Sequence, residues 1–247
     1  MHCSYATYSI IVGLSKGVRA EILWRSFFIQ GAWNFKGMQN IGFVYSILPG
    51  LKSICPDFLD KAAARYSRFF NTHPYMSPTI AGVFLHLEET GDHEMIEKLR
   101  NSIAGSLAAI GDYLFWATLK PIIALIFILS VITEQLWGIA LTLIVYNSLH
   151  LWTMTWGFTQ GYKDGPEGAL KIGRALSIER AKLLSYGTPL LSGAVLAMIA
   201  LWEGIGAGLV PGISIFCLCI IAQRLRLGVF WIFYGIFTLT LIWAIIQ

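Results

Sequence analysis

Four polar residues interrupt apolar stretches of this chain, and their side chains are suited to binding a small polar solute. Asp112 lies inside the run Asn101–Pro121, Glu88 ends the apolar segment FLHL, and Gln39 and Asn40 separate two clusters of large apolar residues. Carboxylates accept hydrogen bonds, and side-chain amides both donate and accept them. These residue types therefore match the hydroxyl groups of a polyol.

Asp112 marks a predicted break in a membrane segment. An acid at the centre of a membrane helix costs roughly 2.5–3.5 kcal/mol on insertion scales. Gly111 beside it removes side-chain bulk, and Pro121 cannot donate a helical hydrogen bond. Unpaired backbone in a bilayer is tolerated where it meets protein or water, which is typical of solute sites. The alternative is a helix–turn–helix corner in which Asp112 pairs with Lys120 or caps the second helix.

The other three polar positions also have structural alternatives. Gln39 and Asn40 can satisfy backbone groups at a glycine break, and Glu88-Glu89 can form a solvated helix end. The sequence alone leaves both interpretations open at each position.

One group of residues has the spacing of a metal site. His86, Glu89 and His93 fall at i, i+3 and i+7, so one helical face could hold two imidazoles and a carboxylate. Gly91-Asp92 is expected to end the helix before His93, so we predict no metal site. A metal-dependent membrane enzyme remains only as a distant alternative.

Composition places the chain among membrane proteins. Its mean hydropathy is +0.64 and 13% of its 247 residues are charged, against about 25% in an ordinary soluble domain. The net charge of +4 includes no basic run interleaved with aromatic residues, which argues against nucleic-acid binding. No CxxC pairs the four cysteines, so we expect reduced thiols. No Gly-rich phosphate loop precedes a helix and no HExxH motif is present, and no cofactor is predicted.

The first hundred residues predict amphipathic helices. Residues 21–50 place large apolar side chains at helical spacing, with a stop expected at Pro49-Gly50, and residues 51–70 predict a short surface helix. His73 precedes Pro74, which forces it out of the helical region and favours a structural role. Another helix begins near Pro78, and residues 92–101 are expected to form a loop with one helical turn.

The second half predicts membrane spans. Apolar stretches cover residues 122–133, 136–158, 186–203, 207–222 and 227–246, and residues 159–185 are expected to form a long polar loop. We therefore predict an all-α, multi-span integral membrane protein with amphipathic N-terminal helices and a broken central membrane segment. It would be one domain, 1–247, with an amphipathic or re-entrant half (1–100) and a transmembrane half (101–247).

A series of motifs, in order and over about residues 21–200, resembles the IID subunits of the mannose/fructose/sorbose family of bacterial phosphotransferase systems. The motifs are Gln30-Gly31-Ala32-Trp33-Asn34, Met38-Gln39-Asn40-Ile41-Gly42-Phe43, Asn71-Thr72-His73-Pro74, Leu87-Glu88-Glu89, Ile110-Gly111-Asp112, Leu119-Lys120-Pro121 and Trp156-Gly157-Phe158. Each is weak alone, but the ordered set is specific.

The resemblance implies a multi-pass protein of the bacterial inner membrane that joins a IIC chain to form a sugar-conducting unit. IIA and IIB would carry phosphoryl groups to the sugar, a hexose, and IIC–IID pairs would form a higher oligomer in the bilayer. The chain would hold no catalytic residue, cofactor or metal of its own. The sugar contacts, or the residues that line the moving element, would be Gln39, Asn40, Glu88 and Asp112. The remaining motif positions would be structural: Trp33, Asn34, Asn71, His73, Pro74, Glu89, Gly111, Lys120 and Pro121.

The sequence departs from the family pattern at two places, and the shortened segment at the first of them favours an alternative. Residues 201–211 form a brief glycine-rich link where the family usually has a longer segment, and Tyr113-Leu114 replaces a small or proline-led pair. The alternative is a regulatory or receptor-like membrane protein that keeps the IID fold without transport.

Overall fold

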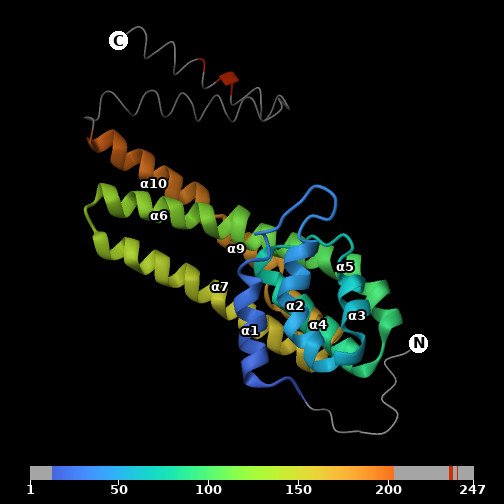
Figure 1. Ribbon diagram of the computed structural model, residues 1–247. Coiled ribbons are helices and arrows are strands. Elements are labelled where there is room, and N and C mark those ends of the chain that lie inside the picture. Colours follow the sequence, from blue (N-terminus) through green and yellow to red (C-terminus); the bar gives the residue numbers. More distant parts are fainter. Residues whose placement is uncertain (1–12, 203–233, 236–237, 239–247) are drawn as a thin grey trace.

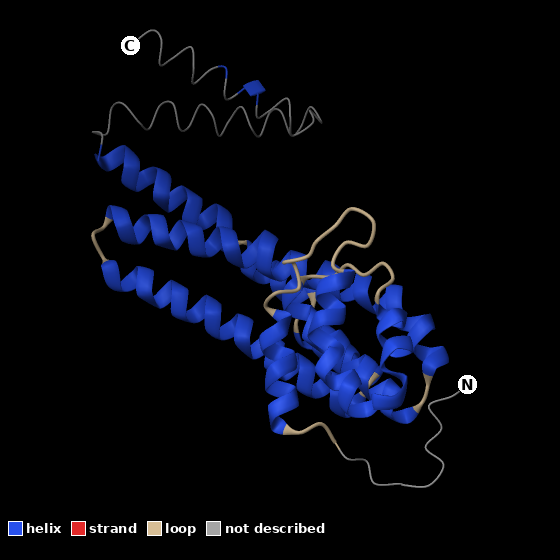
Figure 2. Ribbon diagram, viewed as in Figure 1, coloured by secondary structure: helices blue, strands red, loops and turns tan. Residues whose placement is uncertain are grey.

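Helices form the framework of the chain in the computed structural model, which describes residues 13–202 together with residues 234, 235 and 238 (Figure 1). Figure 2 shows that loops in this part of the chain are mostly short connections. Its only extended pairings are two isolated bridges, Asn34 with Met38 and Met38 with Phe70. The prediction of an all-α membrane fold is confirmed.

The first described elements lie within residues 16–90. They are α1 (Lys16–Ser26), α2 (Asn40–Ile54), the 3₁₀ turn η1 (Pro56–Phe58), α3 (Leu59–Tyr66), the 3₁₀ turn η2 (Pro74–Met76) and α4 (Ser77–Thr90). The later elements are α5 (His93–Gly111), the π-helical segment η3 (Asp112–Leu119), α6 (Lys120–Ile132), α7 (Leu136–Asp164), α8 (Pro166–Ala175), α9 (Ile178–Ser185) and α10 (Gly187–Trp202).

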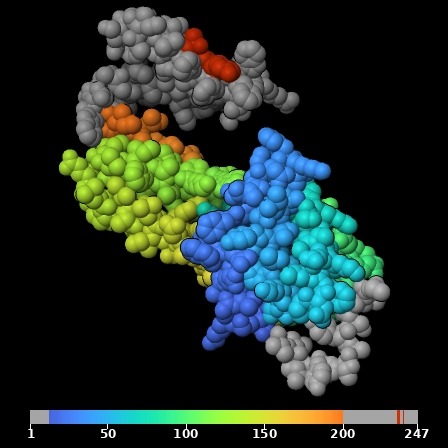
Figure 3. All heavy atoms as spheres, in the orientation of Figure 1, coloured from blue at the N-terminus to red at the C-terminus, as the bar shows by residue number. Residues whose placement is uncertain are grey.

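The described chain divides into a compact head and an extended arm. The head contains α1 to α5, α8 and the C-terminal part of α7, whereas the arm contains α6, α10 and the N-terminal part of α7 (Figure 1). Figure 3 shows the arm projecting from the head as a separate lobe. Because α7 belongs to both, the arm is anchored in the head by a continuous helix.

An aromatic cluster fills the centre of the head. The rings of Phe43, Tyr66, Phe70 and Phe84 are fully buried, and those of Phe43 and Phe70 stack with their centroids 3.8 Å apart. These residues come from α2, α3, the segment after α3, and α4. Burial of aromatic surface from four segments is a major source of stability for such a core.

Small residues allow α4 and α7 to pack closely. A Cβ atom added at Gly82 would lie 2.5 Å from the carbonyl oxygen of Phe158, and one added at Gly161 would lie 2.3 Å from that of Thr79. No side chain larger than hydrogen fits at that separation. This close approach joins the amphipathic half of the sequence to the transmembrane half.

The helix expected to stop at Pro49-Gly50 instead continues as α2 to Ile54. A proline has no N–H to donate to the carbonyl one turn earlier, which here belongs to Tyr45. Arg25 replaces that donor, since its Nη1 lies 3.2 Å from the Tyr45 oxygen. A side chain from α1 thus helps α2 to pass through its proline.

The interruption expected between Gly111 and Pro121 is a change of helix type, without a gap. The helical hydrogen-bonding pattern widens in η3 and returns to α-helical at Lys120. Pro121 is the second residue of α6. A proline is tolerated in the first turn of an α-helix, where its missing N–H breaks no hydrogen bond within that helix. Single π-helical segments inside α-helices are frequent at functional sites.

Two segments expected to be loops are helical. Residues 92–101 begin α5, which Asp92 caps by accepting a hydrogen bond from the Met95 N–H at 3.0 Å. Residues 159–185 contain the end of α7 and both α8 and α9. In α8, Lys171 is exposed whereas Ile172 is buried, so its charges mark one side of an amphipathic helix.

Three described helical stretches are long and apolar enough to cross a membrane: His93–Ile132, Leu136–Asp164 and Pro166–Ile199. Much of the arm surface is apolar and exposed on the chain itself, as at Leu136 and Trp137. Such a surface needs lipid or another chain to cover it. The expected spans at 122–133, 136–158 and 186–203 correspond to α6, α7 and α10. The span expected at 207–222 lies outside the described residues, and so does that at 227–246 apart from residues 234, 235 and 238.

Candidate functional site

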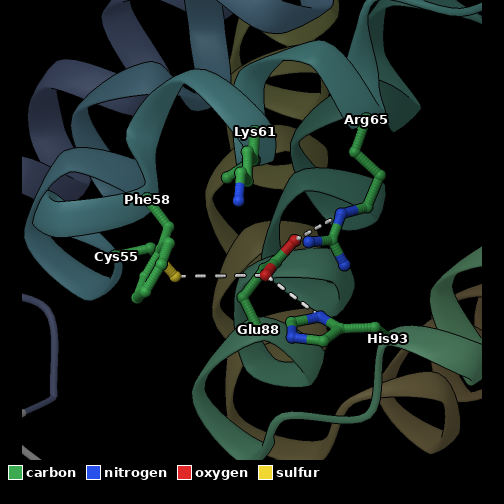
Figure 4. A pocket seen from close by; sticks show the side chains of 7 residues that line it. Cys55, Phe58, Lys61, Arg65, Glu88 and His93 are labelled. Carbon is green, nitrogen blue, oxygen red and sulfur yellow. Dashed lines mark hydrogen bonds and ion pairs between the residues drawn. The ribbon is translucent and has the colours of Figure 1, made fainter. Parts of the chain in front are cut away.

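Glu88 occupies the centre of a charged cluster inside the head (Figure 4). Its carboxylate is fully buried, and the Tyr66 hydroxyl donates a hydrogen bond to Oε1 at 2.7 Å. Arg65 Nε lies 3.6 Å from Oε1, and His93 Nδ1 lies 3.3 Å from Oε2. Burying a carboxylate is costly unless it is paired and hydrogen-bonded, and three neighbouring groups do this here.

Local sequence brings these partners together. Gly91 takes a left-handed conformation with φ of 72° and ends α4 directly after Glu88-Glu89-Thr90. The tight connection to α5 returns His93 to the Glu88 carboxylate. Arg65 and Tyr66 end α3, so three helix termini meet at one acid. Burial and the adjacent carboxylate raise the pKa of Tyr66 well above its usual value.

The pocket beside Glu88 is small. It has a volume of about 40 Å³, and its lining includes Lys61 and Cys55 (Figure 4). Ligand pockets usually measure about 300–1,000 Å³, so this space fits roughly one water molecule. In this structure Glu88 therefore serves the packing of α3, α4 and α5.

Glu89 points to a different set of partners. It accepts a hydrogen bond from the Tyr162 hydroxyl, which itself accepts one from the Leu14 N–H at 2.9 Å. Arg19 lies over the Tyr162 ring, 5.2 Å from its centroid. Partial burial raises the pKa of Glu89. The solvated helix end considered for Glu88-Glu89 is therefore wrong for Glu88, and Glu89 ties α4 to α7.

The metal spacing does not produce a common site. His86 Nδ1 lies 3.0 Å from the Tyr162 carbonyl oxygen, Glu89 contacts the Tyr162 hydroxyl, and His93 faces Glu88. Among the described residues, no three His, Cys, Asp or Glu side chains are grouped to hold an ion.

Gln39 and Asn40 hold the loop after α1 against the segment after α3. Gln39 Oε1 accepts a hydrogen bond from the Thr72 N–H at 3.0 Å, and Asn40 Nδ2 donates to the Ser67 carbonyl at 2.5 Å. Asn34 Nδ2 donates to Asn40 Oδ1 at 3.0 Å. Both predicted sugar contacts thus satisfy backbone or loop groups, as the alternative interpretation proposed.

The start of the same loop is an exposed aromatic surface. Trp33 and Phe35 pack edge to face, with centroids 4.9 Å apart, and both are largely uncovered by this chain. Asn34 closes the turn beneath them by accepting a hydrogen bond from the Gly37 N–H at 2.7 Å.

His73 is packed against the π-helical segment. Its ring is buried and stacks on Phe115 at 5.3 Å between centroids, with Trp116 at 4.9 Å. A Cβ atom at Gly111 would lie 2.4 Å from the His73 Cβ, so the glycine permits this contact. Burial is the main cause that lowers the pKa of His73 to about 3, with the positive charge of Lys120 as a further cause.

The Nδ1 atom of His73 accepts a hydrogen bond from the Tyr75 N–H at 3.2 Å. Pro74 begins η2 beside it. The neutral ring therefore carries its proton on Nε2, which has no partner among the described residues. The structural role predicted for His73 fits this packing.

Sequence reasoning missed the aromatic contacts that extend this cluster. Tyr75 stacks on His150 with centroids 3.6 Å apart, and its hydroxyl lies 3.1 Å from that of Tyr146. These contacts link η2 to α7, 71 or more residues later in the chain. The sequence offered one signal of these contacts. His150 is a polar residue inside an apolar span, which indicates that it faces protein.

Asp112 is exposed on this chain at the start of η3. Its side chain forms no hydrogen bond or ion pair with any residue that the structure describes. The alternative pairing with Lys120 is wrong, because the Lys120 ammonium lies over the Trp116 ring, 5.1 Å from its centroid. Of the four predicted sugar contacts, Asp112 alone remains free to meet a solute or a second chain.

The four predicted contacts do not form one pocket in the described part of the chain. Glu88 lines a cavity that is too small for a sugar, and none of the four residues lines the pockets of about 280 and 420 Å³ in the described part of the chain. A larger pocket of about 280 Å³ lies between α5 and the segment after α3, with Asn71 on its lining.

Comparison with known proteins gives a consistent result. Residues 13–200 match the family model described as "PTS system mannose/fructose/sorbose family IID component". The mannose-specific EIID component of Escherichia coli K12 is 33% identical over 153 residues, covering 58% of this chain and 54% of that protein. The fructose permease IID component of Bacillus subtilis is 28% identical over 195 residues, covering 75% and 70%. The chain thus spans about half the length of the Escherichia coli relative that it matches.

Solved structures share the fold over nearly the whole chain. A chain from the cryo-electron microscopy structure of the mannose transporter ManYZ with microcin E492 is 26% identical, with a TM-score of 0.57. The match covers 93% of this chain and 96% of that one. A second structure, described as that of a membrane protein, is 25% identical with a TM-score of 0.69, covering 92% and 96%.

Proposed function

Because this chain belongs to the mannose/fructose/sorbose family of phosphotransferase IID components, we propose that it is the IID membrane subunit of a sugar phosphotransferase system. In this role it pairs with a IIC chain to form the sugar-conducting permease. The match of residues 13–200 to the family model carries the proposal, because it includes both head and arm. The likeness to a chain of the mannose transporter ManYZ supports a transport role beside a second membrane chain.

Partners and location follow from the same role. IIA and IIB relay the phosphoryl group to the incoming hexose, and pairs of IIC and IID assemble further in the bacterial inner membrane. The exposed apolar arm supports contact with lipid and IIC. We propose that the chain forms one domain, 1–247, and the packing of α4 against α7 supports this for the described part. It carries no phosphoryl group itself, and the burial of His73 is consistent with that.

Uptake tests the proposal directly. Cells that express the chain with its operon-encoded IIC, IIB and IIA partners should take up sugar in a phosphoenolpyruvate-dependent manner, and cells lacking only this chain should not. Unchanged uptake without the chain would overturn the proposed function.

Asp112 is the residue of this chain that we propose meets the sugar or IIC, while Gln39, Asn40 and Glu88 stabilise the head. Its exposure at the start of η3 and its lack of a described partner support this role. Asp112→Asn should abolish most uptake without loss of the IIC–IID complex. Glu94→Gln, at an exposed position on the head, is the matched control and should leave uptake unchanged.

A regulatory or receptor-like protein that keeps this fold without transport is the second candidate. It is motivated by the brief glycine-rich link at residues 201–211, where the family usually has a longer segment. Under this alternative, Asp112→Asn leaves partner binding and signalling intact and no uptake depends on the chain.

A further inference from the structure

A second pocket in the head contains an incompletely paired buried charge. It has a volume of about 280 Å³ and lies between the segment after α3 and the outer side of α5. We call it the Arg100 pocket, and it is lined by Phe69, Phe70, Asn71, Arg100, Asn101, Ala104, Gly105 and Ala108. None of these residues takes part in the role proposed above.

Arg100 is the unusual member of this lining. Its side chain is 5% exposed, yet Nε and Nη1 have no hydrogen-bond partner among the described residues. One acceptor contacts the guanidinium, the Glu97 carboxylate, at 3.4 Å from Nη2. Tyr66 lies against the guanidinium with its ring centroid 5.5 Å away. A buried guanidinium normally has most of its five N–H donors satisfied.

The local charge balance is positive. Glu97 is shared between Arg100 and Arg68, whose Nη1 lies 3.1 Å from the other carboxylate oxygen. Two guanidinium groups and one carboxylate leave a net charge of +1 at this edge of the pocket. Arginine in such a setting favours a phosphate or carboxylate group of a ligand.

The remaining lining suits a sugar ring. Asn71 and Asn101 bring amides that can donate to and accept from hydroxyl groups. Phe69 is half-exposed and offers an aromatic face, and the small residues of α5 keep the floor open. A Cβ atom added at Gly105 would meet no other atom within 4 Å. The volume is close to the lower end of ligand pockets, which excludes nucleotide-sized molecules.

We propose that the Arg100 pocket binds a monosaccharide carrying one anionic group, either a phosphate ester or a carboxylate. The anionic group accepts from the Arg100 guanidinium, which turns on binding so that Nε and Nη1, closed to solvent in this structure, reach the pocket. The ring hydroxyls contact the two asparagines. A hexose phosphate is the product of the system, so its binding here would let the product regulate transport by the permease. That last step rests on the proposed function, whereas the binding itself does not.

Binding to the complete complex tests the proposal. The IIC–IID complex, purified in detergent, is titrated by calorimetry with mannose 6-phosphate, glucuronate, mannose and inorganic phosphate. We expect saturable micromolar to low-millimolar binding of one or both anionic sugars; mannose 6-phosphate alone indicates a phosphate-ester site and glucuronate alone a carboxylate site. If neither anionic sugar binds, or if inorganic phosphate alone accounts for the binding, the proposal is wrong.

Two variants locate the site by independent means. Arg100→Gln should weaken binding of the anionic sugar about tenfold or more, because a hydrogen bond to a charged group is lost. Gly105→Leu should weaken it comparably by filling the pocket, without disturbing packed atoms. Gly193→Leu is the matched control, since Gly193 is another helical glycine whose added Cβ meets nothing within 4 Å.

The outcome of this test is separable from that of the uptake test. Wild-type affinity in the Gly105→Leu complex would overturn the Arg100 site even if uptake requires the chain. Equal weakening of mannose and of the anionic sugars by Arg100→Gln would overturn the anionic requirement. Conversely, anionic-sugar binding that is lost in both variants supports the site even if uptake proves independent of this chain.

Discussion

Two buried charges contact different parts of Tyr66, and the fold provides them with different numbers of partners. Its hydroxyl donates to Glu88, whereas its ring faces Arg100. Glu88 has contacts from Tyr66, Arg65 and His93 and leaves a pocket of about 40 Å³. Arg100 has one long contact, to Glu97, and lines a pocket of about 280 Å³.

The comparison separates a structural charge from one that is available for binding. Burial of a charge is tolerated when partners replace the lost water. The chain supplies those partners to Glu88, so its carboxylate stabilises the fold. It supplies them only in part to Arg100, whose Nε and Nη1 are buried without a partner among the described residues. Family membership alone would not distinguish these two sites.

The largest effect is expected at the fully partnered charge. Glu88→Ala leaves Arg65, His93 and the Tyr66 hydroxyl without their common acceptor. Breaking a buried ion pair by removing one partner costs about 3–5 kcal/mol, so we expect that loss in the free energy of unfolding. Denaturant titration of the purified complex in detergent measures it.

Glu94→Gln is the control for that measurement, because Glu94 forms an exposed i,i+4 pair with Lys98. We expect it to leave stability nearly unchanged. A Glu88→Ala complex as stable as this control would remove the contrast between the two charges.

Only one of the two buried charges, Glu88, could be recognised from the sequence. Glu88 was identified because an acid follows an apolar helix, but its partners Arg65 and Tyr66 lie more than twenty residues earlier and had no local signal. Arg100 was missed altogether. It lies in a charged stretch that resembles a solvated surface, and its burial depends on how α5 packs against α3.

The fold was predicted better than its boundaries. Apolar spans and amphipathic helices followed from composition and spacing, and α6, α7 and α10 appear where expected. The proline stop in α2 was wrong because Arg25, from another helix, supplies a donor to the Tyr45 carbonyl. Asn40 was predicted to bind sugar, yet it holds Ser67 and Asn34. Tertiary hydrogen bonds decided each of these cases.

A second prediction concerns His73, a buried base that is kept neutral. Its pKa is about 3 in the folded chain, against 6.5 when unperturbed. Between these values the unfolded chain binds a proton that the folded chain excludes. Stability should therefore fall as the pH drops below 6.5, by about 1.4 kcal/mol per pH unit from this residue.

Comparison with His73→Asn isolates that contribution. The variant should be less stable than wild type at pH 8, because the stacking on Phe115 is reduced, and the difference should narrow toward pH 4.5. Glu89, whose raised pKa acts in the opposite direction, is common to both proteins and cancels. Parallel pH profiles of unfolding free energy would contradict the buried neutral histidine.

Gly105 and Gly111 lie six residues apart in α5, and alanine at the two positions is expected to change the free energy of unfolding in opposite directions. A methyl group at Gly111 would meet the His73 Cβ at 2.4 Å, whereas one at Gly105 meets nothing within 4 Å. Gly111→Ala should cost about 1–3 kcal/mol through overpacking. Gly105→Ala should stabilise by about 0.5–1 kcal/mol, since alanine is the better helix former. Thermal unfolding of both complexes checks the opposite signs, and equal effects would mean that the Arg100 pocket is closed.

The smallest effect on stability is expected where the charge is least satisfied. Arg100→Met keeps the length and apolar stem of the side chain and removes a guanidinium that has one long contact. Replacing a poorly paired buried charge by an apolar residue is often neutral or stabilising, so the free energy of unfolding should change by less than about 1 kcal/mol. The same variant should lose anionic-sugar binding, which separates it from Glu88→Ala, where stability falls first. A loss of several kcal/mol in Arg100→Met would show that the fold needs the guanidinium. Arg100 and Glu88 would then both be structural charges, and the contrast between them would be wrong.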